Sequence, residues 1–157
     1  MKITVLCIGK TSEKYLLLGM EEYRKRLRHF VKVEWIELPE VKNRKGLSQV
    51  ELLANEELLF SKHLKPSDHI FLLDEQGEMY SSVKFSRFLE KKMNAGLSNL
   101  VFLIGGPYGF SEGVYKRSIG KVSVSKMTFT HQMVRLFFLE QLYRGFTILR
   151  NMPYHHQ

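Results

Sequence analysis

Uninterrupted apolar runs alternate along the chain with longer segments in which apolar and charged residues are mixed. A run that is apolar at every position predicts a strand buried on both faces, whereas the mixed segments predict helices. Such runs predict strands at residues 2–9, 69–74 and 99–104. A further strand is expected at 31–38, where charged residues are interleaved, and a weaker one at 121–127. Helices are expected at residues 14–30, 49–64, 85–94 and 130–151. This alternation predicts a single domain over residues 1–157 with a three-layer α/β fold, in which a mostly parallel sheet carries helices on both faces.

Local helix-start signals support these assignments. Ser48 with Glu51 three residues later forms a capping-box pattern. Ser81 or Ser82 can cap the next helix, and Ser111 can cap a further short one. These signals define the expected starts of three helices more sharply than the apolar pattern does.

Ligands of such a sheet bind beyond the carboxyl ends of the strands, which here fall at Leu73, at Gly105 and from Val124 onward. The second end lies in the sequence LIGGPYGF, residues 103–110. It matches neither the phosphate loop Gly-x-x-x-x-Gly-Lys-Ser/Thr nor the dinucleotide pattern Gly-x-Gly-x-x-Gly. Pro107 also lacks an N–H that could bind an anion. The loop therefore favours a ligand with an aromatic base and few negative charges, and a simple tight turn is the alternative.

The third strand end is rich in polar groups. Residues Ser123 to Phe129 offer small hydroxyls, a lysine and backbone groups directly before a helix. These atoms are expected to converge on the crevice at the strand ends. Capping of the last helix by Thr128 or Thr130 is the alternative use of the hydroxyls.

The last predicted helix carries apolar residues around most of its circumference, so burial on nearly all sides is expected. Either a subunit interface or a central place in the core explains this pattern. Arg135 and Arg144 are costly in such surroundings unless they are paired, and Glu140 can pair with one of them. His131 can act as a base, although a hydrogen-bonded structural histidine is the more frequent case.

The chain is strongly basic. Lys and Arg number 24 against 16 Asp and Glu, which gives a net charge of +8. An excess of this size favours a polyanionic partner such as RNA, DNA or an anionic surface, and a soluble basic protein without such a partner is the alternative. Because the basic residues fall in separate groups, we expect them on a folded surface rather than in a disordered arm.

Other functional classes are excluded by simpler observations. The lone Cys7 lies in an apolar run and is expected to be a buried hydrophobe, and a disulfide framework is impossible. No segment approaches the ~18 apolar residues of a membrane span, and no secretory signal is found. Cys and His lack zinc-site spacing. We therefore expect a cytoplasmic protein without a metal ion.

Four segments together resemble a known family. MKITVLCIGK, IGGPYGF, SVSKMTFTHQMVRLFFLEQLYRGFTILR and the closing PYH are similar to the SPOUT-class methyltransferases that modify N3 of a pseudouridine in large-subunit (23S) ribosomal RNA. The resemblance covers essentially the whole chain. It implies an enzyme that uses S-adenosylmethionine, acts on ribosomal RNA, forms a homodimer and has a C-terminal trefoil knot.

The resemblance also implies site residues. The cofactor contacts of the family fall on Leu73, Gly105, Val124, Ser125, Lys126, Met127, Thr128 and Phe129. Two departures from the family pattern are Thr130, where proline is usual, and Val124, where a larger residue is frequent.

Three further residues are expected in the chemistry. Arg135 would stabilise charge on the carbonyl oxygens of the target base. His155 would accept the proton, and Tyr154 would stack on or orient the base. A basic ribosome- or RNA-binding factor without methyl transfer is the alternative, and an enzyme acting on a small molecule is a third possibility.

Overall fold

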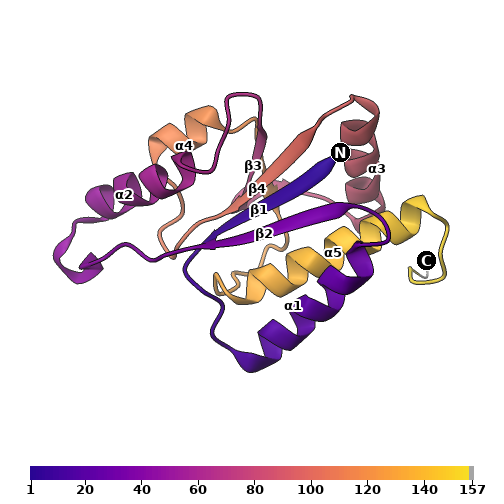
Figure 1. The fold of residues 1–157 in the computed structure, drawn as a ribbon, viewed down its shortest axis with the longest axis horizontal. Helices are drawn as coiled ribbons and strands as arrows, with labels where there is room; N and C mark the ends of the chain where they lie inside the picture. Colours follow the sequence, from indigo (N-terminus) through magenta and orange to yellow (C-terminus); the bar gives the residue numbers. More distant parts are fainter. Residues whose placement is uncertain (156–157) are drawn as a thin grey trace.

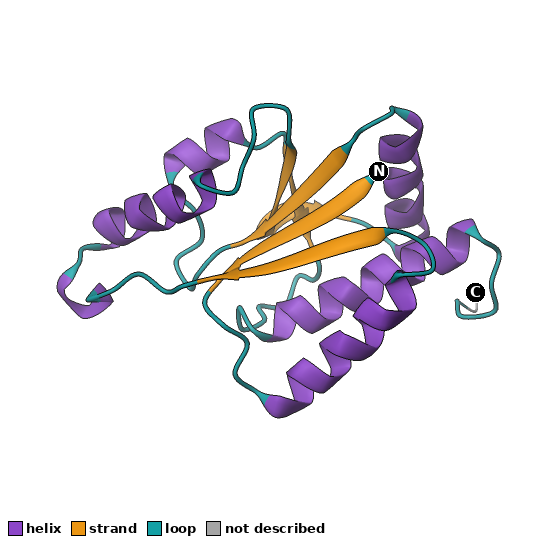
Figure 2. Cartoon of the chain, in the orientation of Figure 1, coloured by secondary structure: helices purple, strands orange, loops and turns teal. Residues whose placement is uncertain are grey.

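The computed structural model describes residues 1–155, and their strands form a five-stranded sheet (Figures 1 and 2). His156 and Gln157, which follow the expected Tyr-His ending, lie outside the described residues. The strands are β1 (Lys2–Ile8), β2 (Lys32–Leu38), β3 (His69–Met79), β4 (Asn99–Ile104) and β5 (Gly120–Ser123). Their order is β2-β1-β4-β3-β5, and every neighbouring pair is parallel. The predicted parallel sheet is confirmed.

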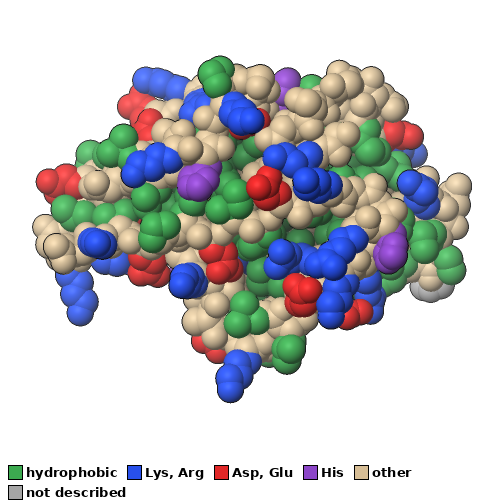
Figure 3. Space-filling view, in the orientation of Figure 1, with side chains coloured by type: hydrophobic (Ala, Val, Ile, Leu, Met, Phe, Trp, Pro, Cys, Tyr) green, Lys and Arg blue, Asp and Glu red, His purple; other side chains and the backbone are tan. Residues whose placement is uncertain are grey.

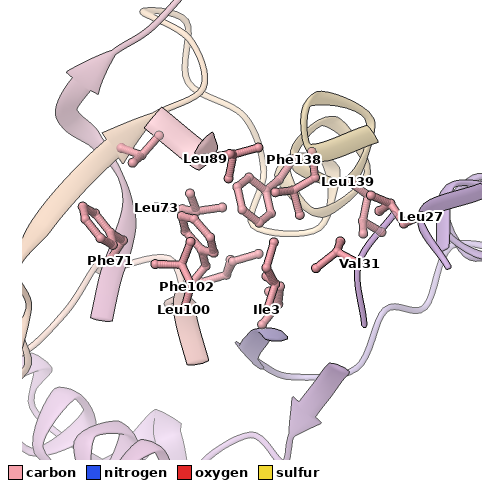
Figure 4. Close-up of a cluster of buried hydrophobic side chains, with 14 of the residues drawn as sticks. Ile3, Leu27, Val31, Phe71, Leu73, Leu89, Leu100, Phe102, Phe138 and Leu139 are labelled. Atoms are coloured by element: carbon pink, nitrogen blue, oxygen red, sulfur yellow. The ribbon is translucent and has the colours of Figure 1, made fainter. Parts of the chain in front are cut away.

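Helices cover both faces of the sheet. They are α1 (Lys14–Leu27), α2 (Gln49–Ser61), α3 (Ser82–Asn94), α4 (Glu112–Arg117) and α5 (Met133–Leu149), with a short 3-10 turn at Arg44–Gly46. On one face Leu89 of α3 and Phe138 of α5 pack with Ile3 and Phe102 of the sheet (Figure 4). On the other face α2 and α4 contribute to a second apolar cluster with β1, β3 and β4. The predicted three layers are therefore confirmed.

The polar caps lie where the sequence predicts them. The Ser48 side chain accepts a hydrogen bond from the Glu51 N–H, and Glu51 bonds back to the Ser48 backbone. Ser81 caps α3, while Ser82 is already the first residue of that helix. Ser111 caps α4.

The segment between β5 and α5 differs from the prediction. β5 ends at Ser123 and α5 begins at Met133, so the strand is shorter and the helix starts later than expected. Ser123 Oγ donates to the Ser125 carbonyl, and Ser125 Oγ accepts from the Met127 N–H. Such local side-chain bonds compete with regular structure. Thr130 Oγ1 accepts from the Met133 N–H, but the N-cap position of α5 is Gln132, whose side chain makes no cap bond.

α5 lies between α1 and α3 across one face of the sheet (Figure 1). Its inner side, including Phe138 and Leu142, is buried in the core of the same chain. Its outer side leaves Phe137 exposed. The central-core explanation therefore accounts for one side of the helix, and the outer side stays available for an interface. The trefoil knot implied by the resemblance stays a prediction.

Candidate active site

A cavity of about 460 Å³ lies at the carboxyl ends of β4 and β5 and beside the irregular middle of β3. Three segments line it: residues 73–76 of β3, the glycine loop after Ile104 and the segment after Ser123. Seven expected cofactor contacts are among its lining residues: Leu73, Gly105, Val124, Ser125, Met127, Thr128 and Phe129. Lys126 is exposed and does not line the cavity. The fold thus brings together three segments that are far apart in the sequence.

The electrostatics of the cavity are opposite to those of the whole chain. Within the described part of the protein, no Lys or Arg lines the cavity, although the chain has a net charge of +8. Asp74 and Glu75 do line it, beside the apolar Ile104 and Val122. Because a multiply charged anion would meet carboxylates and no cation there, the cavity disfavours phosphate groups and favours a cationic or neutral ligand.

The glycine loop makes a tight turn against its own backbone. Gly106 and Gly109 form an isolated bridge, and Gly109 has a φ of +77°, a conformation that glycine adopts without strain. A Cβ atom on Gly105 would lie 2.5 Å from the Gly109 carbonyl oxygen. Gly105 and Gly109 are therefore required by the turn itself. A side chain at Gly105 would displace the loop even when no ligand is bound.

Two hydrogen bonds link the walls of the cavity. Tyr115 donates to Asp74 Oδ2 at 2.6 Å, and burial together with this bond raises the pKa of Tyr115 to about 12. Thr128 donates to Glu75 Oε2 at 3.1 Å. β3 was expected to end at residue 74 but continues to Met79, with a register shift against β5 between Leu73 and Glu78. Asp74 and Glu75 lie in this irregular part of the strand, and their position directly after the apolar run that ends at Leu73 was the signal for them.

His131 lines the cavity at the start of α5. Burial lowers its pKa below the usual histidine value, and the nearby Arg135 charge lowers it further. The neutral imidazole is thereby favoured. A neutral imidazole in the cavity can accept a proton, but the lowered pKa also makes His131 a weaker base than a free histidine.

The structure contradicts the expected contact between Arg135 and the target base. The side chain is fully buried, and its guanidinium donates at 2.7 to 3.0 Å to the carbonyls of Ile8, Gly9 and His131 and to Thr11 Oγ1, with Glu37 Oε1 at 3.4 Å. These contacts join the loop after β1, the edge strand β2 and the start of α5. Arg135 therefore positions these segments and does not reach the cavity.

The tail packs against its own protomer at the end of α5. Tyr154 donates to Glu140 Oε1 at 3.1 Å, its hydroxyl lies 3.3 Å from that of Tyr23, and the Arg144 guanidinium lies 4.7 Å from its ring centre. His155 Nδ1 is 3.3 Å from Arg144 Nη1. Arg144 and Glu140 form an ion pair, which confirms the predicted partner for one of the two helix arginines. Tyr154 and His155 are thus held against α1 and α5 of their own chain.

The tail and the cavity lie at opposite ends of α5. His131 and Val134 line the cavity at the helix start, whereas Tyr154 follows the helix end. A helix of 17 residues is about 25 Å long. Tyr154 and His155 therefore do not reach the cavity of the same protomer.

Residues 1–155 contain no group of three or more His, Cys, Asp or Glu side chains placed to hold a metal ion. None of the helices in this part of the chain is long and apolar enough to span a membrane.

The family comparison places the chain in a class of methyltransferases. The chain matches the family described as "Predicted SPOUT methyltransferase" over residues 1–155, and it belongs to that family. A solved structure of a probable methylase family protein from Haemophilus influenzae shares the fold, with a TM-score of 0.51 and 11% identity, covering 99% of this chain and 70% of that one.

Relatives with higher sequence identity show which branch of these methyltransferases the chain belongs to. The proteins named "Ribosomal RNA large subunit methyltransferase H" from Flavobacterium johnsoniae and Flavobacterium psychrophilum are 56% and 54% identical to this chain, over the full length of both sequences. A protein of the same name from Parabacteroides distasonis is 50% identical over the same extent. The chain is thus a member of the ribosomal RNA large subunit methyltransferase H family.

Proposed function

We propose that the protein methylates N3 of a pseudouridine in large-subunit (23S) ribosomal RNA, on the assembled ribosome, with S-adenosylmethionine as the methyl donor. The observation that carries the proposal is the cavity, whose described lining residues include carboxylates and no Lys or Arg in a chain of net charge +8. Membership of the methyltransferase family supports methyl transfer, and the name of the relatives supports ribosomal RNA as the substrate.

The lining residues fit S-adenosylmethionine. The turn at residues 105–109 offers backbone for close approach of an adenosyl group, with Leu73 and Ile104 as apolar neighbours. Asp74 and Glu75 favour the positive charges of the sulfonium and the amino group. The cofactor supplies an electrophilic methyl group when it is bound.

The residues of the chain have to orient N3 of the base and receive its proton. This proton is acidic because two carbonyl groups flank the nitrogen, so a histidine or a water is a sufficient base. We assign the contact with the base to Tyr154 and the proton to His155. His131 is the second candidate for the proton, since it lines the cavity as a neutral imidazole.

A second copy of the chain is required by this assignment. Since α5 separates the tail from the cavity of its own protomer by about 25 Å, the tail serves the cavity of a partner in a two-fold dimer. Exposed apolar side chains on α1 and α5 mark the interface that we propose: Tyr15, Leu18 and Phe137. Tyr15 Oη lies 3.8 Å from Met133 Sδ, which joins the two helices into one apolar surface.

Basic residues would hold the RNA outside the cavity. Lys and Arg are distributed over the molecular face of Figure 3 in separate groups, with acidic residues between them. Several form exposed pairs one helical turn apart, such as Lys116 with Glu112, which are worth little in stability and can exchange for phosphate contacts. Binding should therefore weaken steeply with salt. A ribosomal substrate also implies a cytoplasmic location.

The test is incubation of the protein with labelled S-adenosylmethionine and either large ribosomal subunits or free ribosomal RNA, followed by nuclease mapping of the label. We expect one labelled pseudouridine and stronger labelling of the subunits. Stoichiometric cofactor binding without transfer to any ribosomal particle would favour a basic RNA-binding factor instead.

A further inference from the structure

Helix α2 contributes no residue to the lining of the cavity, yet it contacts the glycine loop at three places along residues 105–111. Glu56 lies behind Gly106, Phe60 packs on Phe110 with ring centres 6.1 Å apart, and Glu57 accepts a hydrogen bond from Ser111 Oγ at 2.6 Å. Glu56 and Phe60 are one helical turn apart, so the same buried side of α2 carries both.

Glu56 is the unusual member of this set. It is only 5% exposed, and a buried carboxylate costs free energy unless it is hydrogen-bonded. Burial raises its pKa, and a hydrogen bond from the Gly106 backbone lowers it in part. A Cβ atom on Gly106 would lie 2.8 Å from Glu56 Oε1, so the carboxyl occupies the space that a side chain would need. An apolar residue could fill this place but could not bind the Gly106 amide.

Glu57 acts at the other end of the loop. Ser111 is the N-cap of α4, and its hydroxyl is shared between the Glu57 carboxylate and the Val114 N–H. Glu57 also fills the space beside Gly113, where a Cβ atom would collide with its carboxyl group. The two neighbouring glutamates thus hold the first and last parts of the same loop.

We propose that α2 positions the cofactor loop, with Glu56 as a positioning residue that orients the Gly106 backbone and Glu57 as its counterpart at Ser111. The inference rests on the proposed role of the cavity as the S-adenosylmethionine site. Neither carboxylate touches the cofactor. They keep the turn at residues 105–109 in the shape that the adenosyl group meets, so their loss should reduce affinity rather than the rate of the chemical step.

The test compares Glu56→Ala, Glu56→Gln and the control Leu52→Ala. Leu52 lies one turn earlier on the same buried side of α2, so its truncation destabilises the helix packing without removing the carboxyl group. Calorimetry should show S-adenosylmethionine binding weakened about tenfold or more in Glu56→Ala, as loss of a hydrogen bond to a charged group predicts. Glu56→Gln keeps an acceptor oxygen and should bind S-adenosylmethionine nearly as well as the wild type. Leu52→Ala should bind it normally, although its melting temperature should be close to that of Glu56→Ala.

Hydrogen exchange of the cofactor-free protein provides an independent readout. The Gly106 amide should exchange faster in Glu56→Ala than in the wild type or in Leu52→Ala. Unchanged exchange, unchanged affinity in Glu56→Ala, or an equal loss of affinity in Leu52→Ala would each overturn the proposal. A folded Gly105→Val variant that binds normally would instead refute the cavity as the cofactor site, and the exchange result does not depend on that outcome.

Discussion

Replacing Arg135 by Met should destabilise the fold. The substitution keeps an unbranched side chain of similar length but removes every donor of the guanidinium. It leaves the carbonyls of Ile8 and Gly9 and the Thr11 hydroxyl without this partner, and Glu37 without its ion pair. Because Glu37 is partly exposed, the main cost comes from the buried acceptors left without a donor, at about 1–3 kcal/mol each, which gives a total on the order of 3–5 kcal/mol. For a chain of this size that corresponds to a fall in melting temperature of roughly 6–20 °C.

Denaturant unfolding, followed by circular dichroism, measures this effect. Arg24→Met is the matched control, because Arg24 and its partner Glu21 are exposed and their pair should contribute at most about 1 kcal/mol. Arg135→Lys should recover only part of the loss, because an ammonium group cannot reach all the partners of a planar guanidinium. If Arg135→Met unfolded like the wild type and lost only methyl transfer, the positioning role would be wrong and a direct contact with the substrate would be favoured.

Three further predictions concern the dimer, the tail and His131. Leu18→Glu should convert a species of about twice 18.5 kDa into single chains in light scattering, and a wild-type monomer that transfers methyl groups would contradict the interface. Deleting residues 154–157 should abolish transfer but keep cofactor affinity, and full activity would refute the role of the tail. Mixed dimers of that deletion with Gly105→Val should keep one working site if the tail acts on the partner cavity, and none if it acts on its own. Because the pKa of His131 is lowered in the folded state, the unfolded chain binds a proton first as pH falls below about 6.5, and folding stability falls there. His131→Gln should reduce this loss of stability in thermal scans. An unchanged pH dependence in the variant would show that His131 is not its cause.

The parts of the fold that depend on neighbouring residues were predictable from the sequence. Ser48 and Glu51 cap α2 because both partners lie within one turn, and the apolar strands β1 and β4 are recognisable because each is buried on both faces. The end of β5 was not predictable in the same way, since Ser123 and Ser125 bind local backbone groups in place of the strand ladder.

The surroundings of single side chains required the structure. Arg135 was expected at the substrate because its partners at Ile8 and Gly9 are distant in sequence, and only the packing of α5 on the sheet brings them together. Glu56 carried a signal that could have been used. It interrupts a buried apolar row on α2 between Leu52 and Phe60, and a polar residue in such a row indicates a specific partner.

The most direct test of the proposed function compares methyl transfer to two kinds of large ribosomal subunit, one with its pseudouridines and one from cells that lack the synthase for the mapped position. The readout is mass spectrometry of the labelled nucleoside. The proposal predicts a methyl group on N3 of a single pseudouridine in the first subunits and little or none at the same position in the second. Equal labelling of both, a methyl group on another atom, or no transfer to either would contradict it.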